Sequence, residues 1–352
     1  MSSDIHIRKE GHAGRITLTR PKALNALTYD MAMAIDNALS DWSDDPSVAL
    51  IIIDAQGDKA FCSGGDIEEL YNRGRAGDFA FGQAFWRDEY RLNARLAEYA
   101  KPIVSFLQGF VMGGGVGIGC LVRHRVVGET AQIAMPECGI GLVPDVGGSL
   151  LLARAPGRLG EYLGLTAARM GPGDAIYAGF ADTYIAEDNW PEVKGLLCKT
   201  GSVDALITAA TPAPPPILAP TLAPTLAQHQ DRIDAVFSAP SLGAIVAALA
   251  ADTSEFGTAA GKAISRNSPL SMACALAMIT KLRDTRADMR AALAQEYRFT
   301  ARAMEHGDFL EGIRAQIIDR DRNPQWRYAL GDVTSAHVAT MLAPLGPLEL
   351  TF

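Results

Sequence analysis

The chain has 352 residues, of which 48% are hydrophobic and 20% are charged. This composition is typical of a folded globular protein with a sizeable core, and it excludes disorder over most of the length. The formal net charge of −8 argues against a general nucleic-acid-binding protein, because such a protein needs a basic surface. No window reaches the roughly 18 uninterrupted apolar residues of a membrane span, so we expect no membrane insertion.

The cysteines and the first residues of the sequence indicate the compartment. The five cysteines are scattered and show no C-x-x-C spacing, a pattern typical of reduced thiols rather than of a disulfide framework. The first residues, MSSDIHIRKEGHAG, have neither the apolar run of a signal peptide nor the Arg-rich, acid-poor pattern of a transit peptide. We therefore expect a cytoplasmic protein.

Strands, glycine turns and helices alternate along the first part of the sequence. In chain order we expect a β-hairpin at 5–20, a helix at 28–42 with Thr28 as its N-cap, a buried strand within 48–57, a glycine turn at 61–67, a helix at 85–100, a strand at 102–109 and a second glycine turn at 112–119. This alternation predicts α/β layers rather than a helix bundle or a β-sandwich.

The composition changes after residue 208. Residues 209–225 read AATPAPPPILAPTLAPT, where frequent prolines prevent a continuous helix and favour an extended, stiff chain. The segments that follow have helical periodicity. We therefore predict a core at 1–208, a Pro-rich connection at 209–228, and a helical C-terminal region at 229–352 that packs on the core.

The two glycine turns restrict the chemistry. Neither fits the dinucleotide pattern G-x-G-x-x-G, and the chain contains no phosphate-binding G-x-x-x-x-G-K-[ST] loop and no G-x-S-x-G nucleophile motif. Each turn directly follows an apolar strand, where glycines let a small group approach two backbone N–H donors. Such a pair can form an oxyanion hole, although either turn alone is better explained as a tight connection between strand and helix.

Four segments in order resemble the signatures of the crotonase, or enoyl-CoA hydratase/isomerase, superfamily over about residues 5 to 200. They are RPKALNAL (20–27), AFCSGGDI (60–67), GFVMGGGVGIG (109–119) and MPECGIGLVPDVGG (135–148). The resemblance implies an α/β fold, a crotonase-like spiral of ββα units with a C-terminal α-helical region. It also implies an acyl-CoA substrate as the small-molecule partner, with coenzyme A as part of the substrate and no separate cofactor.

The same resemblance implies how the substrate is held. The thioester carbonyl would lie between the N–H groups of Gly65 and Gly114. The adenine and the bent nucleotide would contact the first two segments, through Lys22, Ala23, Asn25, Ser63, Asp66 and Ile67. Lys22 is a candidate for phosphate contact or a solvated surface lysine. The side chain of Asp66 is expected to cap the helix that follows it.

Two carboxylates, Glu137 and Asp145, stand among apolar and glycine residues in the fourth segment. Hydratases of the superfamily carry two glutamates, but this chain has Gly117 where the first would fall, and it has Asp145 where they have a glycine. This pattern, together with the C-terminal sequence DFLEGIRAQIIDRDRNPQW, is similar to the 3-hydroxyisobutyryl-CoA hydrolases of the superfamily. That similarity implies hydrolysis to 3-hydroxyisobutyrate and coenzyme A in valine breakdown, and it makes Glu89 a substrate contact rather than a surface charge.

Hydrolysis of a thioester needs a carboxylate that attacks the carbonyl carbon or takes a proton from water. Two close, buried carboxyl groups have different proton affinities, so one acts as base while the other holds a proton. We favour Glu137 at the carbonyl and Asp145 as its partner, and the reverse stays open.

Two other functions stay open at this point. One is an enoyl-CoA hydratase or isomerase that uses Glu137 alone, and the other is a non-catalytic acyl-CoA-binding protein. The six histidines are dispersed, so we expect no metal site. We expect neither nucleic acid nor membrane as a partner, and we leave homo-oligomerisation open.

Overall fold

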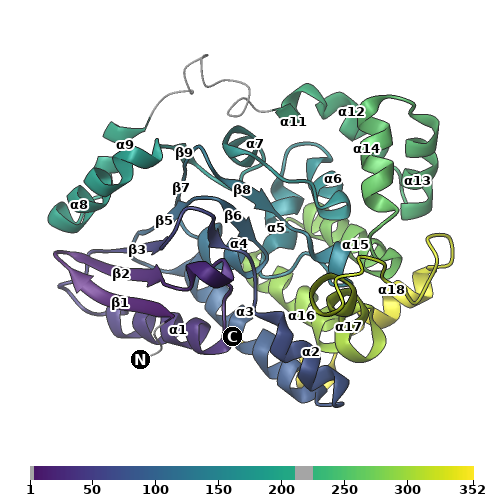
Figure 1. Cartoon of the computed structure of the whole chain (residues 1–352), viewed down its shortest axis with the longest axis horizontal. Coiled ribbons are helices and arrows are strands. Elements are labelled where there is room, and N and C mark those ends of the chain that lie inside the picture. The colour runs from purple at the N-terminus through teal and green to yellow at the C-terminus, as the bar shows by residue number, and fades with distance from the viewer. Residues whose placement is uncertain (1–3, 211–224) are drawn as a thin grey trace. The chain divides into compact units, whose positions relative to one another are not determined.

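The computed structural model describes residues 4–210 and 225–352 (Figure 1). Contacts between residues divide it into two compact units. The strand unit consists of residues 1–65, 91–134 and 169–227. The helical unit consists of residues 66–90, 135–168 and 228–352. Each unit therefore combines three separate parts of the sequence. The domain boundaries that the sequence predicts, at 208 and 228, stay a prediction, and residues 211–224 of the Pro-rich connection lie outside the described residues.

The strands of the strand unit form two sheets. The larger sheet has the order β1-β2-β3-β5-β7-β9, and the smaller sheet has the order β4-β6-β8 (Figure 1). Among the paired strands of the described residues, only β1 and β2 are antiparallel, as expected for the predicted hairpin. The strands are β1 (Ile5–Glu10), β2 (Ala13–Leu18), β3 (Leu50–Ala55), β4 (Ala60–Cys62), β5 (Ile103–Leu107), β6 (Phe110–Met112), β7 (His124–Val127), β8 (Gln132–Ala134) and β9 (Thr183–Tyr184).

Consecutive strands alternate between the two sheets from β3 to β8. Strands β3, β5 and β7 belong to the larger sheet, and β4, β6 and β8 belong to the smaller one. Each turn of the chain therefore contributes one strand to each sheet before the chain returns in parallel. This arrangement confirms the spiral of ββα units that the crotonase resemblance implies.

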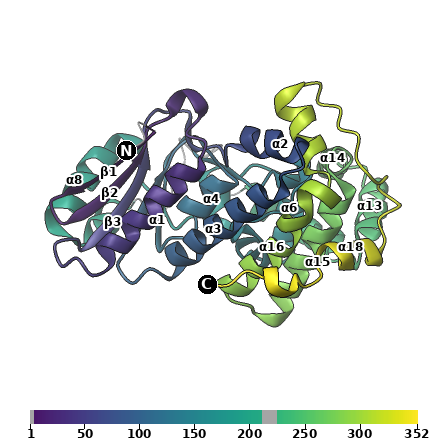
Figure 2. The ribbon, with the colours of Figure 1, turned by 90° about the horizontal axis from the view of Figure 1, so that it is seen from below.

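The larger sheet is covered on both faces. Helix α1 (Tyr29–Ser43) contacts β1, and α8 (Trp190–Thr200) contacts β2; Figure 2 shows the two helices on opposite sides of the sheet. Residues Leu50–Ile53 are fully buried, because alternate side chains of β3 point to opposite covered faces. This confirms the buried strand that the apolar run predicts.

The remaining helices of the strand unit are short, except for α3, which is shared with the helical unit. Helix α3 (Phe79–Glu98) belongs to the helical unit up to Tyr90 and to the strand unit from Arg91. The other helical elements are η1 (Pro21–Ala23), α4 (Gly114–Gly119), α7 (Pro172–Tyr177), η3 (Glu187–Asn189) and α9 (Asp204–Ala209).

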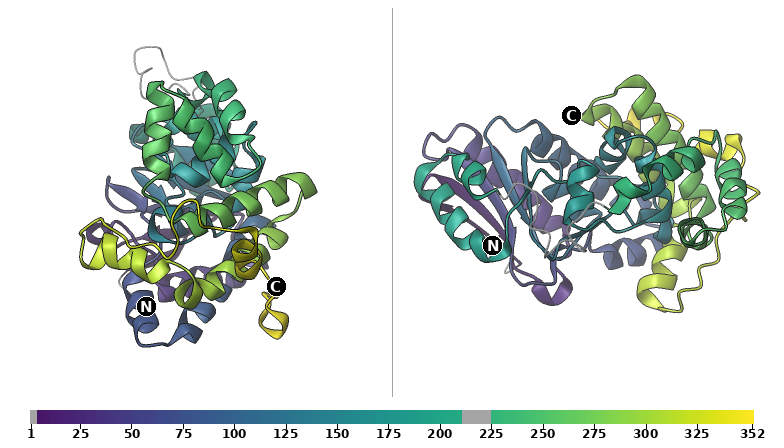
Figure 3. Two further views of the ribbon diagram at one scale, coloured as in Figure 1. Left: turned by 90° about the vertical axis from the view of Figure 1, so that its right-hand side faces the viewer. Right: turned by 90° about the horizontal axis from the view of Figure 1, so that it is seen from above.

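The helical unit contains no strand among its described residues. Helix α15 is central, because it contacts α5, α6, α16 and α18. Helices α12 and α14 pack on α6 beside α13, and α12 to α14 form the green group at the top of the left view in Figure 3. The elements are α2 (Ile67–Arg75), η2 (Glu137–Ile140), α5 (Gly148–Arg154), α6 (Leu159–Thr166), α11 (Thr225–Gln228), which crosses from the strand unit, α12 (Gln230–Phe237), α13 (Leu242–Ala251), α14 (Glu255–Ile264), α15 (Pro269–Thr285), α16 (Met289–His306), α17 (Phe309–Ile313), η5 (Arg314–Ile318), α18 (Ser335–Met341) and η6 (Gly346–Leu348).

In residues 4–210 and 225–352, no helix combines the length and the apolar character needed to cross a membrane.

The fold depends on a close approach at Gly115 in α4. A β-carbon at Gly115 would meet the carbonyl oxygen of Cys62, at the end of β4, so the backbone there must move. We expect Gly115→Ala to lower the free energy of unfolding by about 1–3 kcal/mol, although alanine is the better helix former. Denaturant unfolding measures this change.

Gly195→Ala is the matched control, because Gly195 lies on α8 with no atom within 4 Å of the added β-carbon. It should raise the free energy of unfolding by about 0.5–1 kcal/mol. Equal effects of the two substitutions would contradict the close packing at Gly115.

Candidate active site

The two glycine turns lie side by side in the strand unit. Strand β4 pairs in parallel with β6, with Cys62 opposite Val111, and a glycine turn follows the carboxyl end of each strand. The contact of Gly115 with the Cys62 carbonyl joins the two turns directly. The structure therefore brings together the chain segments that carry Gly65 and Gly114.

The amides of Gly65 and Gly114 have no acceptor among the described residues. Helix α4 begins at Gly114, after Gly113 with a φ of 48°, and the first amides of a helix have no partner inside the helix. In the described part of the chain, no carbonyl or side chain accepts a hydrogen bond from either amide. Two donors of this kind suit an oxyanion, and their role stays a prediction.

The two segments predicted to hold the nucleotide are hydrogen-bonded to each other. Ser63 N donates to the carbonyl of Leu24 over 3.1 Å, and Leu27 N donates to the carbonyl of Gly64 over 2.9 Å. Lys22 and Ala23 are exposed in η1 of this segment. The structure thus brings these predicted contacts together at one place on the strand unit.

Asn25 has a structural task within this loop. Its Oδ1 accepts a hydrogen bond from Arg20 N, and its Nδ2 donates to the carbonyls of Gln56 and Ala60, all at 2.9 Å. The side chain is buried, and its amide group is fully used in shaping the loop. A contact of Asn25 with substrate would therefore use its backbone.

Asp66 and Ile67 lie at the start of α2 in the helical unit. Asp66 occupies the N-cap position, as expected, but its carboxylate forms no capping hydrogen bond. The expectation that this side chain caps the helix is therefore wrong. The proposed substrate contacts of Asp66 and Ile67 stay predictions.

Three predicted carboxyl groups converge in the helical unit. Glu89 on α3, Glu137 in η2 and Asp145 before α5 are only 3–4% exposed. The hydroxyl of Tyr90 donates a hydrogen bond to Asp145 Oδ2 over 2.7 Å, whereas Glu137 Oε2 has no partner among the described residues. Asp145 is thus held in one orientation, and Glu137 has a free oxygen.

Burial and mutual repulsion raise the proton affinity of these groups. Desolvation raises the pKa of Asp145 to about 7, against the opposing effect of the Tyr90 hydrogen bond. Desolvation and the charge of Asp145 raise the pKa of Glu89 to about 8. The same two causes raise the pKa of Glu137 well above its ordinary value. The pKa values of Asp145 and Glu89 therefore lie near neutral pH, the range that suits general acid–base chemistry.

Sequence reasoning missed two members of this cluster, Tyr90 and Glu296. Glu296 on α16 is fully buried, and desolvation, followed by the charge of Asp145, raises its pKa to about 8. A signal was present, because Glu296 has helical spacing from the apolar residues Leu293 and Phe299 and so lies on the buried face of its helix. Nothing in the sequence alone identified its partners.

The C-terminal segment after α16 packs against the turn that carries Glu137. A β-carbon at Gly312 of α17 would meet the carbonyl of Ile140, and one at Gly141 would meet the backbone of Asp308. Only glycine allows these two approaches. The segment that resembles the hydrolases thus supports the η2 turn and its glutamate.

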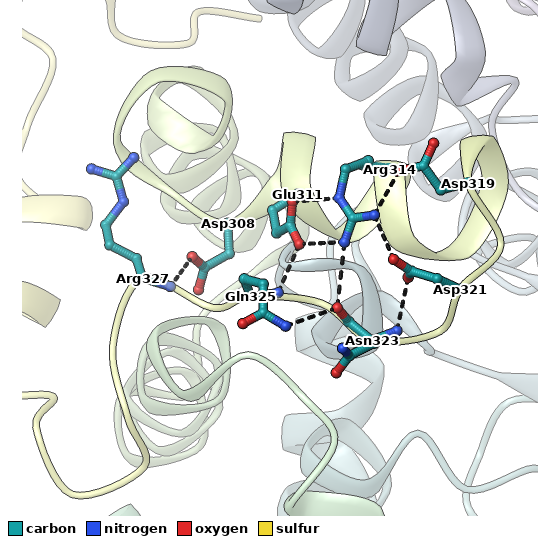
Figure 4. A network of polar contacts seen from close by, with 8 residues as sticks. All are labelled: Asp308, Glu311, Arg314, Asp319, Asp321, Asn323, Gln325 and Arg327. Atoms are coloured by element: carbon teal, nitrogen blue, oxygen red, sulfur yellow. Dashed lines mark hydrogen bonds and ion pairs between the residues drawn. The ribbon is translucent and has the colours of Figure 1, made fainter.

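A polar network centred on Arg314 joins α17 to the loop that follows it. Arg314 donates to the carboxylates of Glu311, Asp319 and Asp321 at 2.7–2.8 Å and to the carbonyl of Asn323 at 3.3 Å (Figure 4). These contacts hold the loop against α17 and η5. The network is charged and partly exposed, so it does not belong to the buried cluster.

No group of three His, Cys, Asp or Glu side chains within residues 4–210 and 225–352 is arranged to hold a metal ion.

Comparison with known proteins identifies the family. Residues 13–342 match the enoyl-CoA hydratase/isomerase family. The chain therefore belongs to this family, the crotonase superfamily.

Particular relatives share nearly the whole chain. It is 36% identical to the mitochondrial 3-hydroxyisobutyryl-CoA hydrolase of Gallus gallus, over 99% of this chain and 91% of that protein, and 35% identical to the human protein of the same name, over 100% and 91%. The structure is similar to that of an enoyl-CoA hydratase from Rhodobacter sphaeroides, with a TM-score of 0.93, 55% identity and coverage of 99% of this chain and 100% of that one. A carnitinyl-CoA dehydratase from Mycobacterium thermoresistibile gives a TM-score of 0.92, 39% identity and coverage of 100% and 99%.

Glu89 provides a test of the cluster's electrostatics. The pKa of Glu89 is about 8 in the folded chain and lower in the unfolded chain. Its contribution to the free energy of unfolding is therefore complete at pH values below its pKa in the unfolded chain, and it is lost as the pH rises through about 8. Glu89→Gln removes the buried charge. We expect it to raise the free energy of unfolding by on the order of 1–3 kcal/mol at about pH 9, relative to its effect at about pH 5.

Urea unfolding at the two pH values measures this difference. Glu68→Gln is the matched control, because Glu68 is an exposed glutamate of α2, and it should show no difference between the two pH values. A Glu89→Gln variant that loses more stability at high pH than at low pH would contradict the raised pKa.

Proposed function

We propose that this protein is an acyl-CoA thioester hydrolase that converts 3-hydroxyisobutyryl-CoA to 3-hydroxyisobutyrate and coenzyme A, a step of valine breakdown. The observation that carries the proposal is the buried pair of Glu137 and Asp145, with Asp145 hydrogen-bonded to Tyr90. The names of the relatives that match the full chain support the same substrate.

The carboxyl groups have distinct tasks in this reaction. Glu137, whose Oε2 is unpartnered, acts at the thioester carbonyl as nucleophile or as the base that takes a proton from water. Asp145, held by Tyr90, orients the water or the substrate hydroxyl. The oxygen of water ends on the acyl carbon, the C–S bond breaks, and a proton reaches the departing sulfur.

The other predicted residues bind the substrate. The amides of Gly65 and Gly114 stabilise the negative charge that develops on the carbonyl oxygen. Lys22, Ala23, Asn25, Ser63, Asp66 and Ile67 contact the nucleotide part, and Glu89 contacts the acyl part. The reaction needs no separate cofactor, because coenzyme A enters with the substrate.

We also propose that the protein acts in the cytoplasm. All five cysteines are buried free thiols, as is typical of a reducing compartment. The animal relatives carry the word mitochondrial in their names, so cell fractionation is the test.

A second candidate function is hydration of an enoyl-CoA. The similarity to the hydratase from Rhodobacter sphaeroides at 55% identity favours it. Gly117 opposes it, because this buried position of α4 has no side chain where hydratases carry their first glutamate. Glu137 alone would then have to activate the water.

One experiment separates the two functions. Purified protein is incubated with 3-hydroxyisobutyryl-CoA and with crotonyl-CoA, while free thiol and the enoyl absorbance are followed. A hydrolase releases thiol from the first substrate and leaves the enoyl absorbance of the second unchanged. Rapid loss of the enoyl absorbance without thiol release would show a hydratase instead.

Substitution of Glu137 tests its role. Glu137→Gln keeps the shape of the side chain but can neither attack a carbonyl nor accept a proton, so we expect thiol release to fall by a factor of about 100 or more. Binding of the CoA ester, measured by calorimetry, should change little. Glu192→Gln, the same change at an exposed position of α8, is the control and should retain activity. Activity of Glu137→Gln within a few-fold of the wild type would remove Glu137 from the mechanism.

A further inference from the structure

The turn that carries Asp145 has an unfavourable backbone conformation. Gly148 N donates to the carbonyl of Asp145 over 2.7 Å, and the two residues between them, Val146 and Gly147, have φ angles of 53° and 81°. Positive φ at both central residues is the pattern of a type I′ turn, which favours glycine and asparagine. A β-branched residue such as Val146 is strained there, and such strain persists only where surrounding contacts impose it.

Glu296 supplies those contacts from a distant part of the sequence. Its Oε2 accepts a hydrogen bond from Gly147 N over 2.8 Å, and its Oε1 accepts from Ser149 N over 3.2 Å and from the Ser149 hydroxyl. Gly147 is the N-cap of α5 and has no side chain to cap the helix. Glu296 therefore replaces the missing cap and fixes the turn at the same time.

The helix of Glu296 also supports the partner of the Asp145 side chain. Tyr297, the next residue on α16, packs its ring at 79° to the ring of Tyr90 with 6.3 Å between the centroids. The oxygen of Thr300 lies 3.4 Å from the hydroxyl of Tyr90. Helix α16 thus fixes the backbone of Asp145 through Glu296, and it fixes the hydroxyl that binds the Asp145 carboxylate.

We propose that Glu296 is a positioning residue that holds the strained Asp145–Gly148 turn and thereby keeps the Asp145 carboxylate on Tyr90, within the carboxyl cluster. Both oxygens of Glu296 are occupied, Oε2 by the N–H of Gly147 in the turn and Oε1 by the N–H and hydroxyl of Ser149, the residue that follows the turn. Glu296 therefore acts through Asp145 and does not react itself. The inference rests on the proposed function in one respect, because it treats Asp145 as one of the reacting pair.

The first test is kinetic. Glu296→Gln keeps the shape but turns an NH₂ group toward a backbone donor, so the turn relaxes. We expect kcat for thiol release to fall by about 30-fold or more, while KM changes less than about threefold. Gln295→Met is the matched control, because Gln295 is buried on the same helix and donates to the Met278 carbonyl, away from the turn. Its kcat should stay near wild type, and an unchanged kcat in Glu296→Gln would overturn the proposal.

The second test is rescue by relief of strain. Glycine adopts the backbone conformation of Val146 freely, so Val146→Gly should make the turn less dependent on Glu296. The fold-loss in kcat that Glu296→Gln causes should then be at least about threefold smaller in the Val146→Gly background than in the wild type. An equal loss in both backgrounds would contradict the link between Glu296 and the strained turn.

A structural test does not depend on the substrate. In a crystal structure of Glu296→Gln, the Asp145–Tyr90 hydrogen bond should be broken and the φ of Val146 should be negative. An unmoved Asp145 in this variant would overturn the proposed role of Glu296, whatever the activity of the wild type. Absence of thiol release by the wild type would instead refute only the proposed function. If Glu296→Gln does not fold, Ser149→Ala removes one donor to Glu296 and should shift the turn in the same direction. No shift in that variant would overturn the proposal equally.

Discussion

The burial of four neighbouring carboxyl groups is the constraint on which the helical unit depends. Glu89, Glu137, Asp145 and Glu296 are at most 4% exposed, and no Lys, Arg or His among the described residues forms an ion pair with them. Removing carboxylates from water without a cation is costly, so burial raises the pKa of each of the four groups above its ordinary value. The hydrogen bonds from Tyr90 and from the Asp145 turn offset part of this cost. Carboxyl groups buried in this way can transfer protons near neutral pH, but their burial lowers the free energy of unfolding.

The C-terminal region gives the cluster its geometry. Helix α16 supplies Glu296 to the Asp145 turn, and α17 supplies Gly312 to the Glu137 turn, so each of these two carboxyl groups has a support from beyond residue 288. The Arg314 network closes the segment that follows α17 (Figure 4). This provides a physical reason for the sequence of the C-terminal region, which lies far along the chain from the carboxyl groups that it supports.

Much of this arrangement could be predicted from sequence. The ordered glycine segments predicted the fold and the two turns after β4 and β6, and the apolar surroundings of Glu137 and Asp145 predicted their burial. Tyr90 and Glu296 could not be assigned, because a hydrogen-bond partner 55 or 149 residues away depends on tertiary packing. The positive φ of Val146 was equally hidden, since valine does not favour it. Asp66 was expected to cap α2 with its side chain and does not, because position alone does not fix a rotamer.

The most direct test of the account is the pH dependence of kcat/KM for thiol release from 3-hydroxyisobutyryl-CoA by the wild-type protein. This parameter reports the ionisation of the free enzyme. If Glu137 must lose its proton before reaction, activity should fall as pH decreases, with an apparent pKa of about 7 or higher, because burial raises the pKa of Glu137 well above its ordinary value and that of its partner Asp145 to about 7. A fall that begins only at about pH 4–5, where an ordinary solvated carboxyl group titrates, would contradict the account.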